Sequence, residues 1–163
     1  MTHYQIYPTA LGQVLIAADD LGLLALHISA AAAEPARATA DWRRQASALT
    51  DRAAAQLSEY LCGERRDFDL PLNPRGTEFQ RRVWASLRAI PYGETRSYRE
   101  QAAALGNPKA IRAAARANGA NPIAIVVPCH RVIGADGSLT GYAGGLEMKA
   151  RLLNLEGAAF AAS

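Results

Sequence analysis

One turn-rich stretch near the middle of the chain separates two parts with different hydrophobic periodicity. Prolines, glycine and asparagine concentrate in Asp69-Leu70-Pro71-Leu72-Asn73-Pro74-Arg75-Gly76, and such residues interrupt regular structure. Short apolar runs typical of strands precede this stretch, whereas apolar residues at helical spacing follow it. We therefore predict an α+β protein, with a small N-terminal sheet domain at 1–72 and a mostly helical domain at 73–163.

The first part has the pattern of an antiparallel meander. Three short apolar runs, Tyr4–Tyr7, Gln13–Ala17 and Leu23–Ile28, are separated by Gly12 and by a turn at Asp19–Gly22. Each run is long enough for one strand, and each connection is short enough for a hairpin. We expect the three strands to be neighbours in one sheet.

One helix is predicted after these strands. Leu49, Ala53 and Leu57 are spaced along one face of the segment Ser47–Cys62, and Gly63 stands where a glycine would end the helix. The alanine-rich segment Ala30–Thr39 shows little pattern and is predicted to be a loop or a weak helix.

The second part begins with two helix-start signatures. Thr77–Gln80 forms a capping box before an apolar stripe that Pro91 closes. A second capping box at Ser97–Glu100 opens a short helix that Gly106 ends. Asn107-Pro108 then resembles a helix restart, with asparagine as N-cap and proline in the first turn.

The restarted helix is predicted to run to about Asn118, with Gly119 ending it. Two short helices joined by a glycine-containing turn form a helix-turn-helix pattern. The second helix carries Lys109, Arg112 and Arg116 beside small alanines, which would let its backbone approach DNA closely. Many compact helical domains contain such pairs, so this pattern also permits a plain packing role.

Bulk composition limits the class of protein. The formal net charge is +3 and the pI is about 9.1, which permits a polyanionic partner without demanding one. No long apolar run and no secretory signal are visible, so we expect no membrane partner. Two cysteines, Cys62 and Cys129, give no disulfide framework, and the default location is the cytoplasm.

The chemically distinctive feature is Cys129 followed by His130, at the end of an apolar run. A thiol beside an imidazole is the minimal arrangement of an activated nucleophile, although a buried thiol can equally be an inert packing residue. Glu156 is placed in the last turn of the final predicted helix, at the unfavourable end of its dipole. A histidine partner would explain that carboxylate, which predicts a Glu156–His130–Cys129 relay.

The connection between this pair and the final helix is rich in glycine. Asp136-Gly137 predicts a hairpin-type turn, and Thr140–Gly145 is a glycine-rich loop. The final helix carries Met148, Leu152, Leu153 and Leu155 and ends at Glu156-Gly157.

The run Pro128-Cys129-His130-Arg131-Val132 resembles the active-site motif of the O6-alkylguanine-DNA alkyltransferases of the bacterial type. The resemblance extends from about Thr77 to Gly157. It includes the Ser97-Tyr98 helix start, Asn107–Ala113, Asn121-Pro122, Tyr142–Gly145 and Leu155-Glu156-Gly157. The first part is similar only loosely, where the family has a ribonuclease-H-like sheet domain.

The resemblance implies a DNA repair reaction without a cofactor. A monomer would bind double-stranded DNA through the minor groove and flip the alkylated guanine out of the stack. It would move the alkyl group irreversibly from guanine O6 to Cys129, once per chain. O4-alkylthymine is a further possible substrate.

The resemblance also implies residue roles in the chemistry. Cys129 corresponds to the acceptor thiolate, and His130, oriented by Glu156, would draw its proton through a bound water. Tyr98 would push the neighbouring phosphate and donate a hydrogen bond to guanine N3. Asn121 corresponds to a hinge between the recognition helix and the active-site segment.

Further residues are assigned to DNA and to the substrate pocket. Arg112 would fill the gap left by the flipped base. The other residues implied in DNA binding are Ala113, Lys109 and Arg116, and those implied in the pocket are Val132, Tyr142, Ala143, Thr140 and Lys149.

Some positions depart from the family pattern. Thr140 stands where some relatives have glycine, so we expect a narrower pocket. Ala143 replaces a serine of some members, with little loss because the backbone amide makes the contact. His3 and His27 have no cysteine partners near them in sequence, so no metal site is expected.

Three other classes of protein compete with this interpretation, and Cys129 itself argues against the first of them. A non-catalytic lesion binder on this scaffold would carry a non-nucleophilic residue at the position of Cys129. A Cys–His hydrolase would need an oxyanion hole and would leave the basic helix unexplained. A plain helix-turn-helix regulator would recognise a specific operator.

Overall fold

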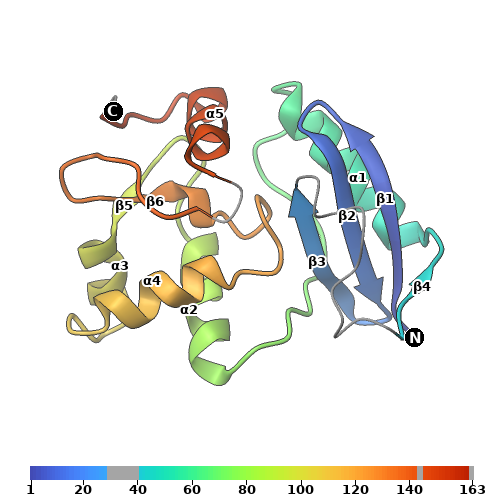
Figure 1. Cartoon of the computed structure of the whole chain (residues 1–163), viewed down its shortest axis with the longest axis horizontal. Coiled ribbons are helices and arrows are strands. Elements are labelled where there is room, and N and C mark those ends of the chain that lie inside the picture. The colour runs from blue at the N-terminus through green and yellow to red at the C-terminus, as the bar shows by residue number, and fades with distance from the viewer. Residues whose placement is uncertain (29–40, 143–144, 162–163) are drawn as a thin grey trace. The chain divides into compact units, whose positions relative to one another are not determined.

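The computed structural model describes residues 1–28, 41–142 and 145–161 (Figure 1). The chain forms two compact units, Met1–Arg75 together with Pro122–Ala124, and Gly76–Asn121 together with Ile125–Ser163. The predicted loop or weak helix at Ala30–Thr39 lies outside the described residues. Within the described ranges, no helix is both long enough and apolar enough to span a lipid bilayer.

The first unit is built on a four-stranded sheet. Its strands are β1 (His3–Thr9), β2 (Gly12–Asp19), β3 (Gly22–Ile28) and β4 (Arg43–Arg44), in the order β3-β2-β1-β4. The two hairpins β1–β2 and β2–β3 are antiparallel, which confirms the predicted meander. The two-residue strand β4 pairs in parallel with β1 and was not predicted.

The central strand β2 is covered on both faces. Its five residues 14–18 are all buried, although successive side chains of a strand point to opposite faces. The predicted helix is present as α1 (Ala48–Leu61), which packs on the sheet (Figure 1) and has Ser47 as its N-cap. Its inward face includes Ala53, Leu57 and Tyr60, all fully buried.

The edge of β3 is joined by two distant segments of the chain. Leu23 pairs with Leu72, and Leu26 pairs with Ile123. Gly22 permits the first of these approaches, because a Cβ at that position would lie 2.7 Å from the carbonyl oxygen of Pro71. The segment Pro122–Ala124 therefore belongs to the first unit despite its position in the sequence.

The second unit is mostly helical. Its elements are α2 (Glu78–Arg88), β5 (Arg96–Ser97), α3 (Tyr98–Ala104), α4 (Ile111–Gly119), the short 3-10 helix η3 (Cys129–Arg131), β6 (Val132–Ile133) and α5 (Leu146–Glu156). Thr77 and Ser97 cap α2 and α3 in the two predicted capping boxes. The strands β5 and β6 pair in parallel.

The start of α4 differs from the prediction. The helix begins at Ile111, without a side-chain cap, and Asn107-Pro108 lies in the preceding turn. The Asn107 carbonyl accepts a hydrogen bond from the amide of Ala110, which closes that turn before the helix begins. Lys109 consequently lies in the turn rather than on the helix, and Gly119 is the last helical residue.

Polar side chains fix the three helices α2, α3 and α4 together. Trp84 of α2 donates through Nε1 to the carbonyl oxygen of Ala117 at 2.8 Å. Gln101 and Asn118 exchange two buried hydrogen bonds, of 2.7 and 2.9 Å, between α3 and α4. These bonds satisfy both buried amides and set the predicted helix-turn-helix pair in one arrangement.

Asp136-Gly137 forms the predicted hairpin-type turn, in which the Gly134 amide also donates to the Ser138 carbonyl oxygen at 2.8 Å. Gly137 adopts a positive φ of 85° and donates to the carbonyl oxygen of Gly134. The preceding strand β6 pairs with β5, and in the described part of the chain no antiparallel strand follows the turn.

Candidate active site

A strained segment of backbone brings Cys129 to its position. Ile125 has a φ of 69°, a left-handed conformation that costs a β-branched residue on the order of 1–3 kcal/mol. Its side chain is 1% exposed, so burial holds the strained backbone in place. Asn121 donates through Nδ2 to the Val127 carbonyl oxygen at 2.8 Å and to Cys129 Sγ at 3.4 Å. Asn121 thus joins the end of the α4 region to the Cys129 thiol.

His130, Arg131 and Glu156 form a buried network behind Cys129. His130 Nε2 lies 2.7 Å from Glu156 Oε2. Arg131 binds both carboxylate oxygens, with Nε at 2.8 Å from Oε1 and an NH2 nitrogen at 3.0 Å from Oε2, and it also donates to the Ile90 carbonyl oxygen at 2.7 Å. The His130 and Glu156 side chains are fully buried and that of Arg131 is 7% exposed.

His130 is arranged as a neutral base. Burial lowers its pKa, and the hydrogen bond and charge of Glu156 oppose that shift only in part. A neutral imidazole donating through Nε2 to Glu156 keeps its lone pair on Nδ1. Nδ1 is buried and has no hydrogen-bond partner among the described residues. It is therefore available to accept a proton.

The thiol of Cys129 is held in its protonated form at rest. Burial raises its pKa, while the Asn121 hydrogen bond and the positive charge of Lys149 lower it in part. The side chain is nevertheless only half-buried. A protonated thiol is a weak nucleophile, so this arrangement requires a base at the moment of reaction.

Tyr98, Thr140 and Lys149 meet at one carbonyl oxygen. The Tyr98 hydroxyl and Lys149 Nζ both donate to the Thr140 carbonyl oxygen, at 2.8 and 2.9 Å. Lys149 is fully buried, and this burial lowers its pKa to about 8. Its Nζ also lies 5.9 Å from the centroid of the Tyr98 ring.

The remaining residues predicted for the pocket are placed as follows. The hydroxyl of Tyr142 is buried without a hydrogen-bond partner among the residues described, and burial together with the nearby Cys129 raises its pKa. Val132 is buried at the start of β6. Thr140 is exposed, with its hydroxyl on Tyr98. Ala143 lies outside the described residues.

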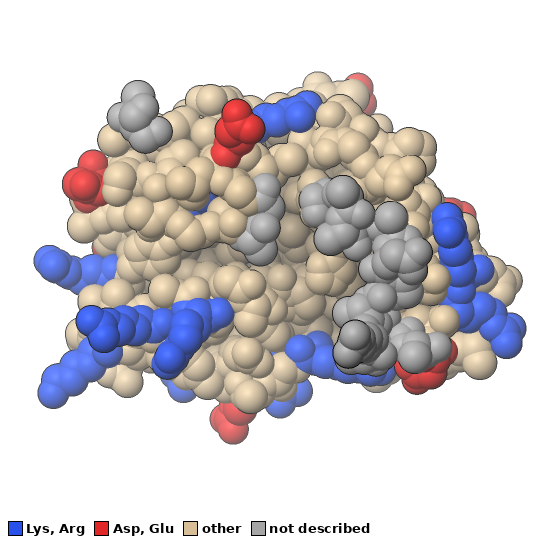
Figure 2. All heavy atoms as spheres, in the orientation of Figure 1, with Lys and Arg blue, Asp and Glu red and all other residues tan. Residues whose placement is uncertain are grey.

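The predicted DNA-binding cations are on the surface of the second unit. Lys109, Arg112 and Arg116 are exposed, and Ala113 is half-buried beside them. Figure 2 shows lysine and arginine side chains gathered over α3 and α4. None of these four residues takes part in the buried network around Glu156.

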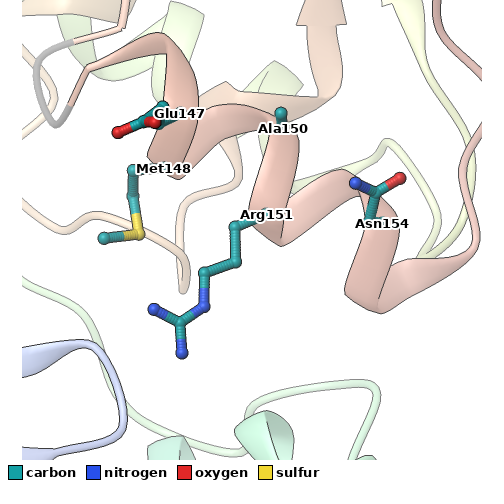
Figure 3. A pocket seen from close by; sticks show the side chains of 5 residues that line it. All are labelled: Glu147, Met148, Ala150, Arg151 and Asn154. Atoms are coloured by element: carbon teal, nitrogen blue, oxygen red, sulfur yellow. The ribbon is translucent and has the colours of Figure 1, made fainter.

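A hollow lies along α5 on the side away from Lys149 and Glu156. It has a volume of about 590 Å³ and is lined by Glu147, Met148, Ala150, Arg151 and Asn154. Figure 3 shows the side chains of Met148 and Arg151 extending into the same space. Lys149 and Glu156 lie instead on the buried face of α5, so neither residue lines this hollow. Over the described ranges, no three His, Cys, Asp or Glu side chains are grouped to hold a metal ion.

Sequence reasoning did not identify Arg131 as a partner of Glu156. A pairing across 25 positions leaves no local pattern in the sequence, and Arg131 stands out there only as part of the Pro128–Val132 motif. One signal was present in the sequence: the helix dipole destabilises a carboxylate in the last turn, so Glu156 is stabilised by a nearby cation.

Comparison with known proteins identifies the family. Residues 78–158 match the family described as 6-O-methylguanine DNA methyltransferase, DNA binding domain, and residues 2–74 match its ribonuclease-like domain. These matches confirm the predicted fold class and the resemblance read from the sequence.

Relatives that are similar along nearly the whole chain indicate the same family. The chain is 48% identical over 155 residues to the methylated-DNA–protein-cysteine methyltransferase of Methanosarcina acetivorans, covering 95% of this chain and 98% of the relative. It is 50% identical over 156 residues to the protein of the same name from Mycolicibacterium paratuberculosis, covering 96% and 93%. The crystal structure of Mycobacterium tuberculosis OGT in complex with DNA has a TM-score of 0.86 and 46% identity, covering 95% and 92% of the two chains. With relatives this similar over nearly its full length, the chain belongs to the 6-O-methylguanine DNA methyltransferase family.

Proposed function

We propose that this protein repairs DNA by moving an alkyl group from O6 of guanine to Sγ of its own Cys129. The observation that carries the proposal is the site itself: Asn121 contacts Sγ, and the next residue in the chain, His130, is a buried neutral base held by Glu156. Relatives named methylated-DNA–protein-cysteine methyltransferases support the same reaction class.

Activation of the thiol begins with proton transfer. A water molecule carries the proton of Cys129 Sγ to Nδ1 of His130, because Nε2 is already committed to Glu156. The charge of Lys149 and the amide of Asn121 then stabilise the thiolate. Each unit by which such groups lower a pKa corresponds to about 1.4 kcal/mol.

The transfer is a single in-line displacement. The thiolate attacks the alkyl carbon, a C–S bond forms, and the bond between that carbon and guanine O6 breaks with its electron pair passing to guanine. Tyr98 donates a hydrogen bond to guanine N3, and the amide of Ala143 holds O6, so the developing charge is stabilised. The product is a thioether that is not readily reversed, so each chain reacts once.

Binding of the substrate uses the exposed cations of the second unit. Lys109, Arg112 and Arg116 contact double-stranded DNA, with the small side chain of Ala113 allowing close approach in the minor groove. Arg112 fills the gap left when the alkylated nucleotide is flipped out. The carbonyls of Cys129 and Val132 accept from the exocyclic amine of the flipped base, with Tyr142 beside it.

The protein would act as a monomer in the cytoplasm. One chain supplies the acceptor, the base and the DNA-binding helix, so no second copy is needed. The reaction also requires Cys129 as a free thiol, and both Cys62 and Cys129 are free in the structure, as a reducing compartment would maintain them.

The test is mass spectrometry of the intact chain after incubation with duplex DNA containing O6-methylguanine. We expect one methyl group per chain, mapped by peptide analysis to Cys129 and not to Cys62. The variants Cys129→Ala and Cys129→Ser should take up none while still binding DNA. A methyl group on Cys62, continuing turnover, or binding without transfer by the parent would each reject the proposal.

A further inference from the structure

Among the residues that the structure describes, the Tyr98 hydroxyl makes two hydrogen bonds, both with Thr140. It donates to the Thr140 carbonyl oxygen at 2.8 Å, and the Thr140 side-chain hydroxyl donates to the phenolic oxygen at 3.3 Å. The second bond comes from a side chain that glycine could not provide. Thr140 is therefore more than a bulky residue in a loop, because its Oγ1 reaches the phenolic oxygen of Tyr98.

We propose that Thr140 is a positioning residue that sets the hydrogen-bond donor strength of Tyr98. This inference rests on the proposed function, in which Tyr98 donates to guanine N3. The Thr140 hydroxyl donates to the phenolic oxygen and stabilises negative charge there. A phenol whose oxygen accepts such a bond gives up its own proton more readily to another acceptor.

The same geometry allows the Tyr98 hydroxyl to change its hydrogen-bond acceptor from the Thr140 carbonyl oxygen to guanine. In the free protein, the Tyr98 proton points at the Thr140 carbonyl, so it must turn away to reach a guanine. Lys149 Nζ also donates to that carbonyl, at 2.9 Å, and it keeps the oxygen hydrogen-bonded after Tyr98 leaves. The change therefore exposes no unsatisfied carbonyl oxygen, whose desolvation would otherwise oppose it.

Water weakens the hydrogen bond from the Thr140 hydroxyl to Tyr98, so its effect depends on whether the site is exposed to solvent. Both partners are accessible in the free protein, where water competes with a 3.3 Å hydrogen bond. DNA bound over the site would exclude that water, and the bond would then act at full strength on the leaving guanine. We therefore expect Thr140 to influence the transfer rate much more than the stability of the free protein.

The experiment compares methyl transfer rates for the parent, Thr140→Val and Thr140→Ser on duplex DNA containing O6-methylguanine. Valine keeps the branched shape and removes the hydroxyl, whereas serine keeps the hydroxyl and removes the methyl group. We expect Thr140→Val to be about threefold to tenfold slower, the range set by one hydrogen bond. Thr140→Ser should restore most of the rate, and all three should melt at the same temperature.

A double-mutant cycle with Tyr98→Phe tests the route of the effect. In the Tyr98→Phe background no phenolic oxygen remains, so Thr140→Val should cause no further loss. An equal loss in both backgrounds, or a Thr140→Val rate equal to that of the parent, would overturn the inference while leaving the proposed function intact. Failure of the parent to take up any methyl group would instead reject the proposed function.

Discussion

Removing the Arg131 guanidinium should destabilise the second unit more than any surface change of charge. Arg131 neutralises Glu156 through two hydrogen bonds of 2.8 and 3.0 Å and satisfies the Ile90 carbonyl oxygen at 2.7 Å. The carboxylate that would be left behind is fully buried. Breaking a buried ion pair by removing one partner costs about 3–5 kcal/mol. The free energy of unfolding of a domain is typically only about 5–15 kcal/mol, so Arg131→Met would remove a large part of it.

The assay is urea unfolding followed by the fluorescence of Trp84, which is buried between α2 and α4. The chain has two tryptophans, so a Trp42→Phe background leaves Trp84 as the reporter of the second unit. Arg96→Met is the matched control, because its ion pair with Glu94 is exposed and such pairs contribute about 0–1 kcal/mol.

Two outcomes decide this reasoning. Adding Glu156→Gln to Arg131→Met should recover part of the loss, because it removes the unpaired charge and still accepts from His130. A loss at Arg131 no greater than that at Arg96, or no recovery with glutamine, would refute the claim that charge burial dominates.

Three further predictions concern DNA and pH. Arg112→Ala should slow repair in duplex DNA far more than transfer from free O6-benzylguanine, since an inserted side chain helps only where a base stack must be opened; equal losses would assign Arg112 to the chemistry or the fold. Affinity for undamaged duplex DNA should fall as the salt concentration rises, and the slope of log affinity against log salt concentration should be shallower for Arg116→Ala. A selection experiment should show little preference for any DNA sequence. Burial lowers the pKa of Lys149 from 10.5 to about 8, so above about pH 8 the unfolded chain holds a proton that the folded protein has released. In a Cys129→Ser background, stability relative to Lys149→Met should therefore rise between about pH 8 and pH 10, and parallel pH curves would contradict this.

Features that depend on neighbouring residues were predictable from the sequence. The capping boxes at Thr77 and Ser97 and the meander of the first unit depend on residues within a few positions of each other. The pairing of His130 with Glu156 was also predicted, because a motif and an unfavourably placed carboxylate pointed to the same site.

Features that depend on residues far apart in the sequence were not predictable from it. The parallel pairing of β4 with β1 and the addition of Pro122–Ala124 to the first unit arise from contacts that no local pattern encodes. The prediction that a helix starts at Asn107-Pro108 was wrong, because this N-cap sequence forms a turn and the helix begins three residues later, at Ile111. Lysine is almost always exposed, so nothing local indicated that Lys149 would be fully buried.

The charges around His130 decide whether it can serve as a base. Glu156 raises the pKa of His130, whereas burial, first, and then the charge of Arg131 lower it, and the net direction is downward. Without Arg131, one of the charges that lower this pKa is lost, so a larger fraction of His130 becomes the charged imidazolium, which has no lone pair to receive the thiol proton. Arg131 therefore acts with burial and Lys149 to keep His130 neutral, while it also stabilises the fold. An Arg131 variant that still folds should consequently transfer methyl groups more slowly, and raising the pH should restore part of its rate.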